Sequence, residues 1–143
     1  MRVGMIGTGA ISNLHARAYR NIGYRITVCT DIFEEAGRRF AAANGAEFVK
    51  TYQEVCRHPE VDYVDVCTFP DFRLEPVRLC AETGKHVQVQ KPVATNLETA
   101  REMIDVAHPN AGRGRLTTTF VFADDRARVL PCARKASYDP SVV

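Results

Sequence analysis

The stretch "MIGTGAISNLHARAY", residues 5–19, decides the fold. A short apolar run that contains Val3 leads into two glycines two positions apart, and a helix-like pattern follows at once. Glycine inside a helix or strand costs about 0.5–1 kcal/mol relative to alanine. A glycine pair at a strand-to-helix junction therefore indicates that the backbone must approach something closely, and we expect that ligand to be small and anionic.

The glycine spacing matches a dinucleotide-binding turn. In such a turn the first glycine makes the bend, the second lets the backbone approach a pyrophosphate, and a small third residue packs helix against strand. The N–H groups that begin the helix face the phosphates, and the helix dipole favours negative charge there. A glycine turn without a phosphate is the alternative. The predicted contacts are Gly7, Gly9, Ala10, Ile11 and Ser12.

Asp31 ends the second predicted strand, about twenty residues beyond the glycine turn. A carboxylate at this place accepts hydrogen bonds from the ribose hydroxyls of adenosine. A helix N-cap is the alternative role, because Glu34 follows three residues later. The carboxylate would repel a 2′-phosphate, and Ile32 stands where a basic residue would help NADP. The sequence therefore favours NAD as the cofactor, with NADP second.

Apolar and amphipathic segments alternate along the chain. A glycine follows residues 10–22 and 33–44 and predicts the C-terminal end of a helix in each case. Helix starts are predicted by Ser/Thr-x-x-Glu capping boxes at 51–54 and 95–98. We expect the first helix to bury Ile11, Leu14 and Ala18. Parallel strands need crossovers, and here the crossovers are helical, so the pattern predicts an α/β, doubly wound parallel sheet, a Rossmann fold. After the opening strand, the predicted helices are 10–23, 33–44, 51–58, 71–84 and 97–108, and the predicted strands are 24–31, 46–50, 61–69, 85–90 and 115–122.

Composition excludes several classes of protein. The chain has 143 residues, 45% of them hydrophobic, and its net charge of +2 comes from interleaved acids and bases, so nucleic acid and membrane surfaces are not expected partners. No segment is long enough to span a membrane or to form a signal peptide. The odd set of cysteines lacks a CxxC spacing, which predicts no metal site and reduced thiols in the cytoplasm. These cysteines are Cys29, Cys56, Cys67, Cys80 and Cys132.

Three segments carry a family resemblance. "GMIGTGAISNLHARAY", "VDYVDVCTFPDF" and "GKHVQVQKP" stand in the order and spacing of the glucose-fructose oxidoreductase and inositol dehydrogenase family, Gfo/Idh/MocA. The chain resembles this family over residues 1–122. The resemblance implies an N-terminal NAD-binding domain followed, in full-length members, by a substrate domain that acts on a sugar or polyol, and it allows a homo-oligomer.

The resemblance also implies roles for residues near the nicotinamide. Lys91 matches the catalytic lysine of the Glu-Lys-Pro motif, which hydrogen-bonds the reacting hydroxyl or carbonyl oxygen. Thr68 and Pro70 match a turn that lies beside the cofactor, and Gln90 replaces the motif's glutamate. A solvated lysine and a plain strand-ending turn are the alternatives for these positions. His15 matches a histidine that is common at its place, where packing or hydrogen bonding explains it.

Other positions depart from the family pattern. Arg73 replaces a frequent histidine, Phe69 is larger than usual, and Gln88 puts an amide on a strand that should be apolar. Residues 123–143 show no periodicity and are expected to form an irregular tail, so the chain is expected to lack the substrate domain by truncation or frame shift or as a natural short form. A catalytically silent NAD-binding module that acts through a partner is the alternative function, and a methyltransferase fits less well.

Overall fold

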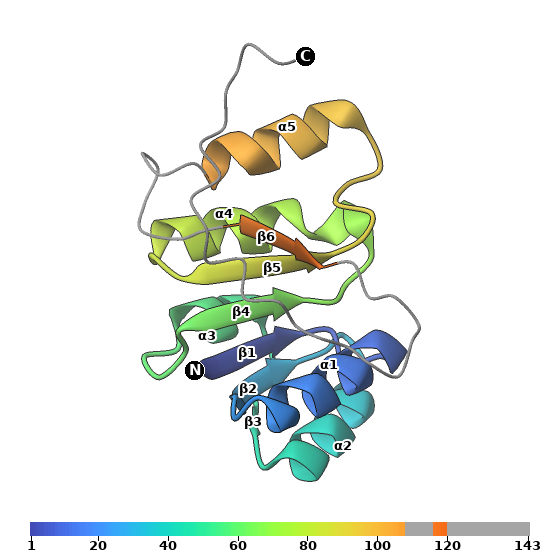
Figure 1. The fold of residues 1–143 in the computed structure, drawn as a ribbon. Coiled ribbons are helices and arrows are strands. Elements are labelled where there is room, and N and C mark those ends of the chain that lie inside the picture. The colour runs from blue at the N-terminus through green and yellow to red at the C-terminus, as the bar shows by residue number, and fades with distance from the viewer. Residues whose placement is uncertain (108–115, 120–143) are drawn as a thin grey trace.

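The apolar runs of the sequence form one six-stranded parallel sheet with the strand order β3-β2-β1-β4-β5-β6 (Figure 1). The structure is a computed structural model, and it describes residues 1–107 and 116–119. This order is the one that dinucleotide-binding Rossmann folds use. The predicted doubly wound α/β fold is confirmed. The strands are β1 (Arg2–Ile6), β2 (Arg25–Thr30), β3 (Glu47–Phe48), β4 (Tyr63–Val66), β5 (His86–Gln90) and β6 (Leu116–Thr119).

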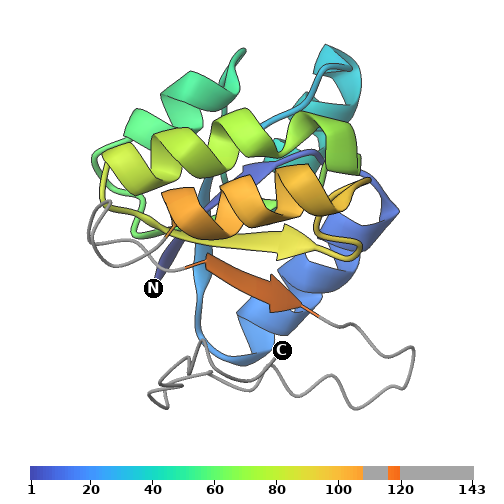
Figure 2. The same ribbon diagram turned by 90° about the horizontal axis from the view of Figure 1, so that it is seen from above.

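Helices cover both faces of the sheet (Figure 2). One core cluster joins β1 and β2 to α1 (Ala10–Asn21) and α2 (Glu34–Asn44). The other joins β4 and β5 to α3 (Tyr52–Arg57), α4 (Leu74–Glu82) and α5 (Leu97–Val106). A short 3₁₀ helix, η1 (Pro70–Phe72), precedes α4. Strand residues alternate between the two clusters, because successive side chains of a strand point to opposite faces.

The helix ends follow local hydrogen bonding. The capping box at Thr51 and Glu54 is confirmed, and Gly45 ends α2 in the left-handed conformation with φ +63°. The second predicted capping box is wrong, because Asn96 is the N-cap of α5 and its side chain accepts from the Thr99 backbone N–H at 2.8 Å. The Thr95 hydroxyl instead donates to the Asp71 carboxylate at 2.9 Å, which ties this loop to η1.

The buried face of α1 differs from the predicted one. Leu14 is 47% exposed, and the helix buries Ser12, His15, Ala16 and Tyr19 instead. The reason lies on β4, where Asp65 accepts hydrogen bonds from His15 and Tyr19. These hydrogen bonds turn His15 and Tyr19 toward the sheet, while Ile11 and Ala18 are half-buried and Leu14 faces outward.

Two predicted strands are shorter in the structure than in the sequence pattern. β3 contains two residues, and the chain leaves β4 after Val66. Several predictions lie outside the described residues: those for both ends of the strand 115–122, for the tail at 123–143, and for His108 and Cys132. No helix among the described residues is long and apolar enough to cross a membrane.

Candidate cofactor-binding and catalytic site

The first glycine of the turn fits tightly at the carboxyl edge of the sheet, where β1 and β4 are neighbours. Gly7 has φ +86°, and a Cβ on it would lie 3.1 Å from the Cys67 carbonyl carbon. Its N–H donates to the Thr30 carbonyl at 2.9 Å. Only glycine meets both demands, a left-handed conformation and contact with the backbone after β4. The strand order reverses between β1 and β4, which places the binding crevice here.

Gly9 and the start of α1 leave an open space. A Cβ on Gly9 would find no atom within 4 Å, and α1 has neither a side-chain cap nor an acidic residue in its first turn. The Ser12 hydroxyl donates to the Gly9 carbonyl at 2.7 Å, and Ser12 is fully buried. The free N–H groups of the first turn, at Ala10, Ile11 and Ser12, therefore border an open space with positive potential, which fits a pyrophosphate.

Asp31 is held by the glycine turn and by the backbone N–H of Phe33, the residue before α2. Its Oδ2 accepts from the Thr8 backbone N–H and from the Thr8 hydroxyl, both at 2.7 Å, and its Oδ1 accepts from the Phe33 N–H at 2.9 Å. The alternative role of Asp31 as helix N-cap is wrong, because Phe33 occupies the N-cap of α2 without a side-chain cap. A carboxylate has about four acceptor positions, so Oδ1 keeps capacity for a ribose hydroxyl.

Arg73 joins the loops that follow β4 and β5. Its side chain is buried, and the guanidinium donates to the carbonyls of Thr68, Gln90 and Pro92. Burial lowers the pKa of Arg73, while the charges of Cys67 and Asp65 act against that shift. Arg73, which replaces a histidine that is frequent in the family, thus bridges two loops of the site. Sequence reasoning named Arg73 only as a departure, and a buried arginine gives no pattern that could have identified this role.

Thr68 and Pro70 lie in the loop after β4, where they were predicted. The Thr68 hydroxyl oxygen is buried and has no hydrogen-bond partner among the described residues. Pro70 begins η1, and Phe69 before it is 77% exposed. A buried hydroxyl without a partner is costly, so Thr68 retains an unused polar atom at the edge of the crevice.

Lys91 follows β5 directly and is exposed. Its backbone N–H donates to the Gln90 side-chain oxygen at 2.7 Å, and the Lys91–Pro92 peptide bond is cis. Within residues 1–107, the Lys91 ammonium has neither a hydrogen-bond nor an ion-pair partner. The predicted residues of the β1, β4 and β5 loops therefore come together at the carboxyl edge of the sheet, and Asp31 joins them beside β2.

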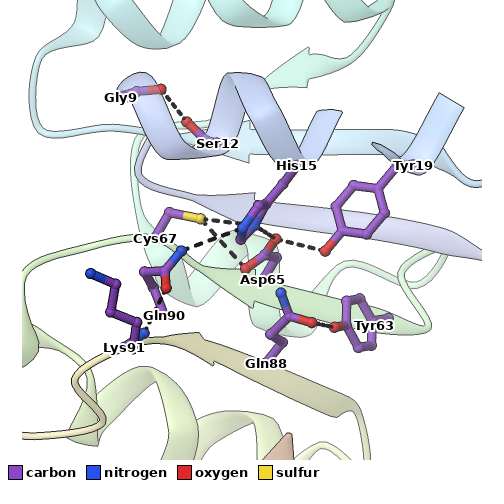
Figure 3. Close-up of polar contacts among 10 residues, drawn as sticks. All are labelled: Gly9, Ser12, His15, Tyr19, Tyr63, Asp65, Cys67, Gln88, Gln90 and Lys91. Atoms are coloured by element: carbon purple, nitrogen blue, oxygen red, sulfur yellow. Dashed lines mark hydrogen bonds and ion pairs between the residues drawn. The ribbon is translucent and has the colours of Figure 1, made fainter. Parts of the chain in front are cut away.

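Below this edge lies a buried polar cluster, which we define as Tyr19, His15, Asp65, Cys67 and Gln90 (Figure 3). Asp65 Oδ2 is 2.6 Å from His15 Nδ1 and accepts from the Tyr19 hydroxyl at 2.6 Å. The Cys67 thiol donates to Asp65 Oδ1 at 3.4 Å, and His15 Nε2 is 3.4 Å from Gln90 Nε2. Burial, together with the Asp65 charge, raises the pKa values of Tyr19 and Cys67 well above their usual range.

Sequence reasoning missed this cluster as a unit. The available signal was Asp65, an acid that stands between two valines inside the predicted strand "VDYVDVCTF". His15, Asp65 and Cys67 also bring three potential metal ligands within 4.8 Å of one another. The 2.6 Å between His15 and Asp65 is a hydrogen-bond length, shorter than the roughly 3.3 Å that separates tetrahedral zinc ligands. These three residues therefore form a hydrogen-bonded group in this structure.

The amide of Gln88 also has a structural explanation. The side chain is buried, and its oxygen accepts a hydrogen bond from the Tyr63 hydroxyl on the neighbouring strand β4. Asp65 pairs with Gln88 in the strand register. Polar residues therefore face one another across β4 and β5 on the side of the sheet that faces α1.

Known proteins are similar to this chain in sequence and in fold. Residues 1–118 match the oxidoreductase family with an NAD-binding Rossmann fold, Gfo/Idh/MocA. The chain is 35% identical over 109 residues to myo-inositol 2-dehydrogenase of Thermotoga maritima, an alignment that covers 73% of this chain and 32% of that protein. It is 34% identical over 113 residues to 1,5-anhydro-D-fructose reductase of Ensifer adhaerens, covering 78% and 34%.

A solved structure gives the same result. The myo-inositol dehydrogenase of Lactobacillus casei, in complex with NAD(H) and myo-inositol, superposes with a TM-score of 0.75 at 26% identity, covering 82% of this chain and 36% of that one. The chain thus spans about one third of the length of the relatives that it matches. On the match over residues 1–118, the chain belongs to the Gfo/Idh/MocA oxidoreductase family and carries the family's NAD-binding Rossmann domain.

Proposed function

We propose that this chain is the cofactor-binding part of an NAD-dependent oxidoreductase that acts on a sugar or polyol, with Lys91 as its catalytic residue. The observation that carries the proposal is the exposed Lys91 ammonium, which has no partner among the described residues and stands at the same carboxyl edge as the glycine turn, with β4 between them. The substrate class is supported by relatives named for myo-inositol and 1,5-anhydro-D-fructose.

The crevice offers a partner for each part of the dinucleotide. The turn at Gly7 and Gly9, with the N–H groups of Ala10, Ile11 and Ser12, would hold the pyrophosphate. Asp31 would accept a hydrogen bond from the adenosine ribose. Thr68 and Pro70 would line the nicotinamide side, and Gln90 would reach its ribose with the amide.

NAD, when bound, supplies a hydride acceptor beside the substrate carbon. The Lys91 ammonium would donate a hydrogen bond to the hydroxyl oxygen on that carbon. As the hydroxyl would release its proton to water and its carbon would release a hydride to NAD, the positive charge of Lys91 would stabilise the negative charge that develops on the oxygen. An exposed lysine without a partner in the described chain can turn toward a substrate without first breaking an ion pair.

Calorimetric titration of the chain with NAD and with NADP tests the cofactor assignment. We expect NAD to bind more tightly, because the Asp31 carboxylate repels a 2′-phosphate. Replacement of Asp31 by alanine should narrow the difference between the two affinities. Equal affinities in the unmodified chain would contradict the role given to Asp31, and absence of binding by either dinucleotide would contradict the proposed function.

A turnover assay separates the catalytic proposal from a silent NAD-binding module. The chain is mixed with NAD and a panel of inositols, aldoses and sugar phosphates, and absorbance of the reduced cofactor is followed. Turnover that Lys91→Ala abolishes and Arg25→Ala retains supports catalysis by Lys91, because Arg25 is an exposed basic residue at the start of β2, at the opposite edge of the sheet. Binding of NAD without turnover favours the module, since substrate orientation alone is worth about 7–11 kcal/mol of a barrier.

A further inference from the structure

The buried polar cluster ends on the backbone of Lys91, and this contact determines which way the Gln90 amide points. The Lys91 backbone N–H lies 2.7 Å from Gln90 Oε1. A backbone N–H group only donates, so the Gln90 atom that it meets must be the amide oxygen. The amide nitrogen of Gln90 therefore points the other way, where His15 Nε2 lies 3.4 Å from it (Figure 3).

The orientation of Gln90 in turn determines the hydrogen positions on His15. The amide nitrogen donates, so His15 Nε2 accepts and carries no hydrogen. The ring hydrogen is then on Nδ1, which donates to Asp65 Oδ2 at 2.6 Å. Tyr19 and Cys67 donate to the same carboxylate. In this arrangement His15, Tyr19, Cys67 and Gln90 each donate to an acceptor within the cluster, which favours a buried polar network.

We propose that Gln90 is a positioning residue that holds His15 as a neutral ring with its hydrogen on Nδ1 and, through the same amide, fixes the Lys91 backbone. A glutamate at position 90, as in the family motif, would have only acceptor oxygens for both neighbours. One oxygen would accept from Lys91 N–H, and the other would require a hydrogen on His15 Nε2. His15 would then carry hydrogens on both ring nitrogens and a positive charge between two carboxylates.

The groups that face His15 fit a neutral ring. Asp65 and Cys67 approach from β4 and its following loop, Tyr19 from α1, and Gln90 from β5. Asp65 is the single carboxylate among them, and the buried Arg73 guanidinium feels its charge. A second buried charge on His15 would have to be desolvated as well, which is costly unless another carboxylate compensates it.

The ring state of His15 can be measured by long-range ¹H–¹⁵N correlation spectra of the ¹⁵N-labelled full chain near pH ~7. We expect His15 Nδ1 to show the shift of a protonated ring nitrogen and Nε2 that of an unprotonated one. A His15→Gln variant assigns the signals among the four histidines. In Gln90→Glu we expect both ring nitrogens of His15 to be protonated.

Gln88→Glu is the matched control. It makes the same change two residues earlier on β5, on the same face of the strand, where the side chain contacts Tyr63 and not His15. We expect it to leave the His15 ring unchanged. The His15→Gln variant should shift the Lys91 backbone amide signal, because it removes the ring nitrogen that orients Gln90, whereas Gln88→Glu should leave that signal in place.

A hydrogen on His15 Nε2 in the unmodified chain would overturn the proposal. An unprotonated Nε2 in a folded Gln90→Glu chain would do the same. The first measurement does not depend on a folded Gln90→Glu chain or on a bound dinucleotide. Any effect of the Lys91 backbone position on catalysis rests on the proposed function. The NAD titration tests that function and the His15 spectra test the ring state, so either one can fail without the other.

Discussion

The two faces of the sheet at β4 and β5 differ in a way that separates stability from function. Toward α3, α4 and α5, four valines with almost no exposed surface form a dry core. Toward α1, the same two strands present hydroxyl, carboxyl and amide groups that bond one another. Adjacent positions of one strand therefore serve different purposes. The valines are Val64, Val66, Val87 and Val89, and the polar residues are Tyr63, Asp65, Gln88 and Gln90.

The polar face stabilises the fold less than the apolar face. Burial of apolar surface contributes about 25 cal/mol per Å², whereas a buried polar group must first lose its water and regains that loss only through hydrogen bonds. The polar face instead ends at Lys91 and the loop after β4, both at the carboxyl edge. Its hydrogen bonds fix orientations there, which van der Waals contacts between valines do not do.

Removing side-chain volume from the apolar face should have the largest effect on stability. Met103 on α5 is fully buried in this core. We expect Met103→Ala to lower the free energy of unfolding by about 2–5 kcal/mol, because a cavity remains where the side chain was. Denaturant unfolding followed by circular dichroism measures the change. The neighbouring Ile104 is 55% exposed and serves as the control, and an equal loss in Ile104→Ala would contradict the assignment of the core.

Removing the bridge between the loops should have the next largest effect. In Arg73→Met the carbonyls of Thr68, Gln90 and Pro92 lose their shared donor. Hydrogen bonds to charged groups contribute about 1.5–3 kcal/mol, so we expect a loss of stability in that range, together with faster amide hydrogen exchange at Lys91. Arg78→Met is the control. Its guanidinium lies on α4 and forms only exposed ion pairs with Glu75 and Glu102.

If Arg73 contributes to stability alone, Arg73→Met would lower the free energy of unfolding and leave amide hydrogen exchange at Lys91 unaltered. That outcome would show that the loops hold their positions without Arg73. Arg73→Lys should not restore the bridge, because an ammonium has no planar fork that can reach several carbonyls at once.

The two glycines of the turn allow stability and binding to be separated directly. We expect Gly7→Ala to destabilise the chain by about 1–3 kcal/mol, because φ +86° is strained for alanine and its Cβ would meet the Cys67 and Thr68 backbone. Gly9→Ala should leave stability nearly unchanged, since its Cβ meets nothing within 4 Å, and should weaken NAD binding. Unfolding and calorimetric titration of both variants check this. Tight NAD binding by Gly9→Ala would argue against a pyrophosphate at this turn.

The sequence predicted the fold well because the fold depends on local patterns. The glycine turn, the β-branched runs and the capping box at Thr51 each act over a few residues, and the structure confirms the doubly wound sheet that they imply. The position of Asp31 beside the glycine turn follows from parallel topology, since the carboxyl ends of β1 and β2 lie at one edge. Sequence spacing is sufficient for such inferences.

The sequence could not predict contacts that join distant segments. The orientation of α1 is set by Asp65, about fifty residues further along the chain, and the apolar pattern alone wrongly buried Leu14. The role of Arg73 depends on three carbonyls that no side-chain pattern encodes. The choice of Asn96 over Thr95 as helix cap depends on Asp71, which binds the Thr95 hydroxyl. In each case a tertiary hydrogen bond outweighed the local preference.

The smallest effect is expected at the opposite edge of the sheet, far from the carboxyl edge. There the Arg2 side chain and backbone N–H both bond the Asp62 carboxylate, at 2.9–3.2 Å, and the pair is largely exposed. The Arg2 side-chain hydrogen bonds, followed by its backbone N–H, lower the pKa of Asp62 from 3.8 to about 2. A carboxylate whose pKa is lower in the folded state stabilises the fold above its unfolded pKa.

This stabilisation should therefore be complete above pH 3.8 and should disappear as the pH falls through about 2. We expect Asp62→Asn to be slightly less stable than the unmodified chain at neutral pH, with a difference that added salt reduces, because water and ions screen exposed pairs. Thermal unfolding of both chains across this pH range measures the difference. Glu82→Gln is the control for the loss of one exposed carboxylate, because Glu82, at the end of α4, has no ion-pair partner within residues 1–107. A difference for Asp62→Asn that persists below pH 2 would mean that the carboxylate acts through packing of its side chain and not through its charge.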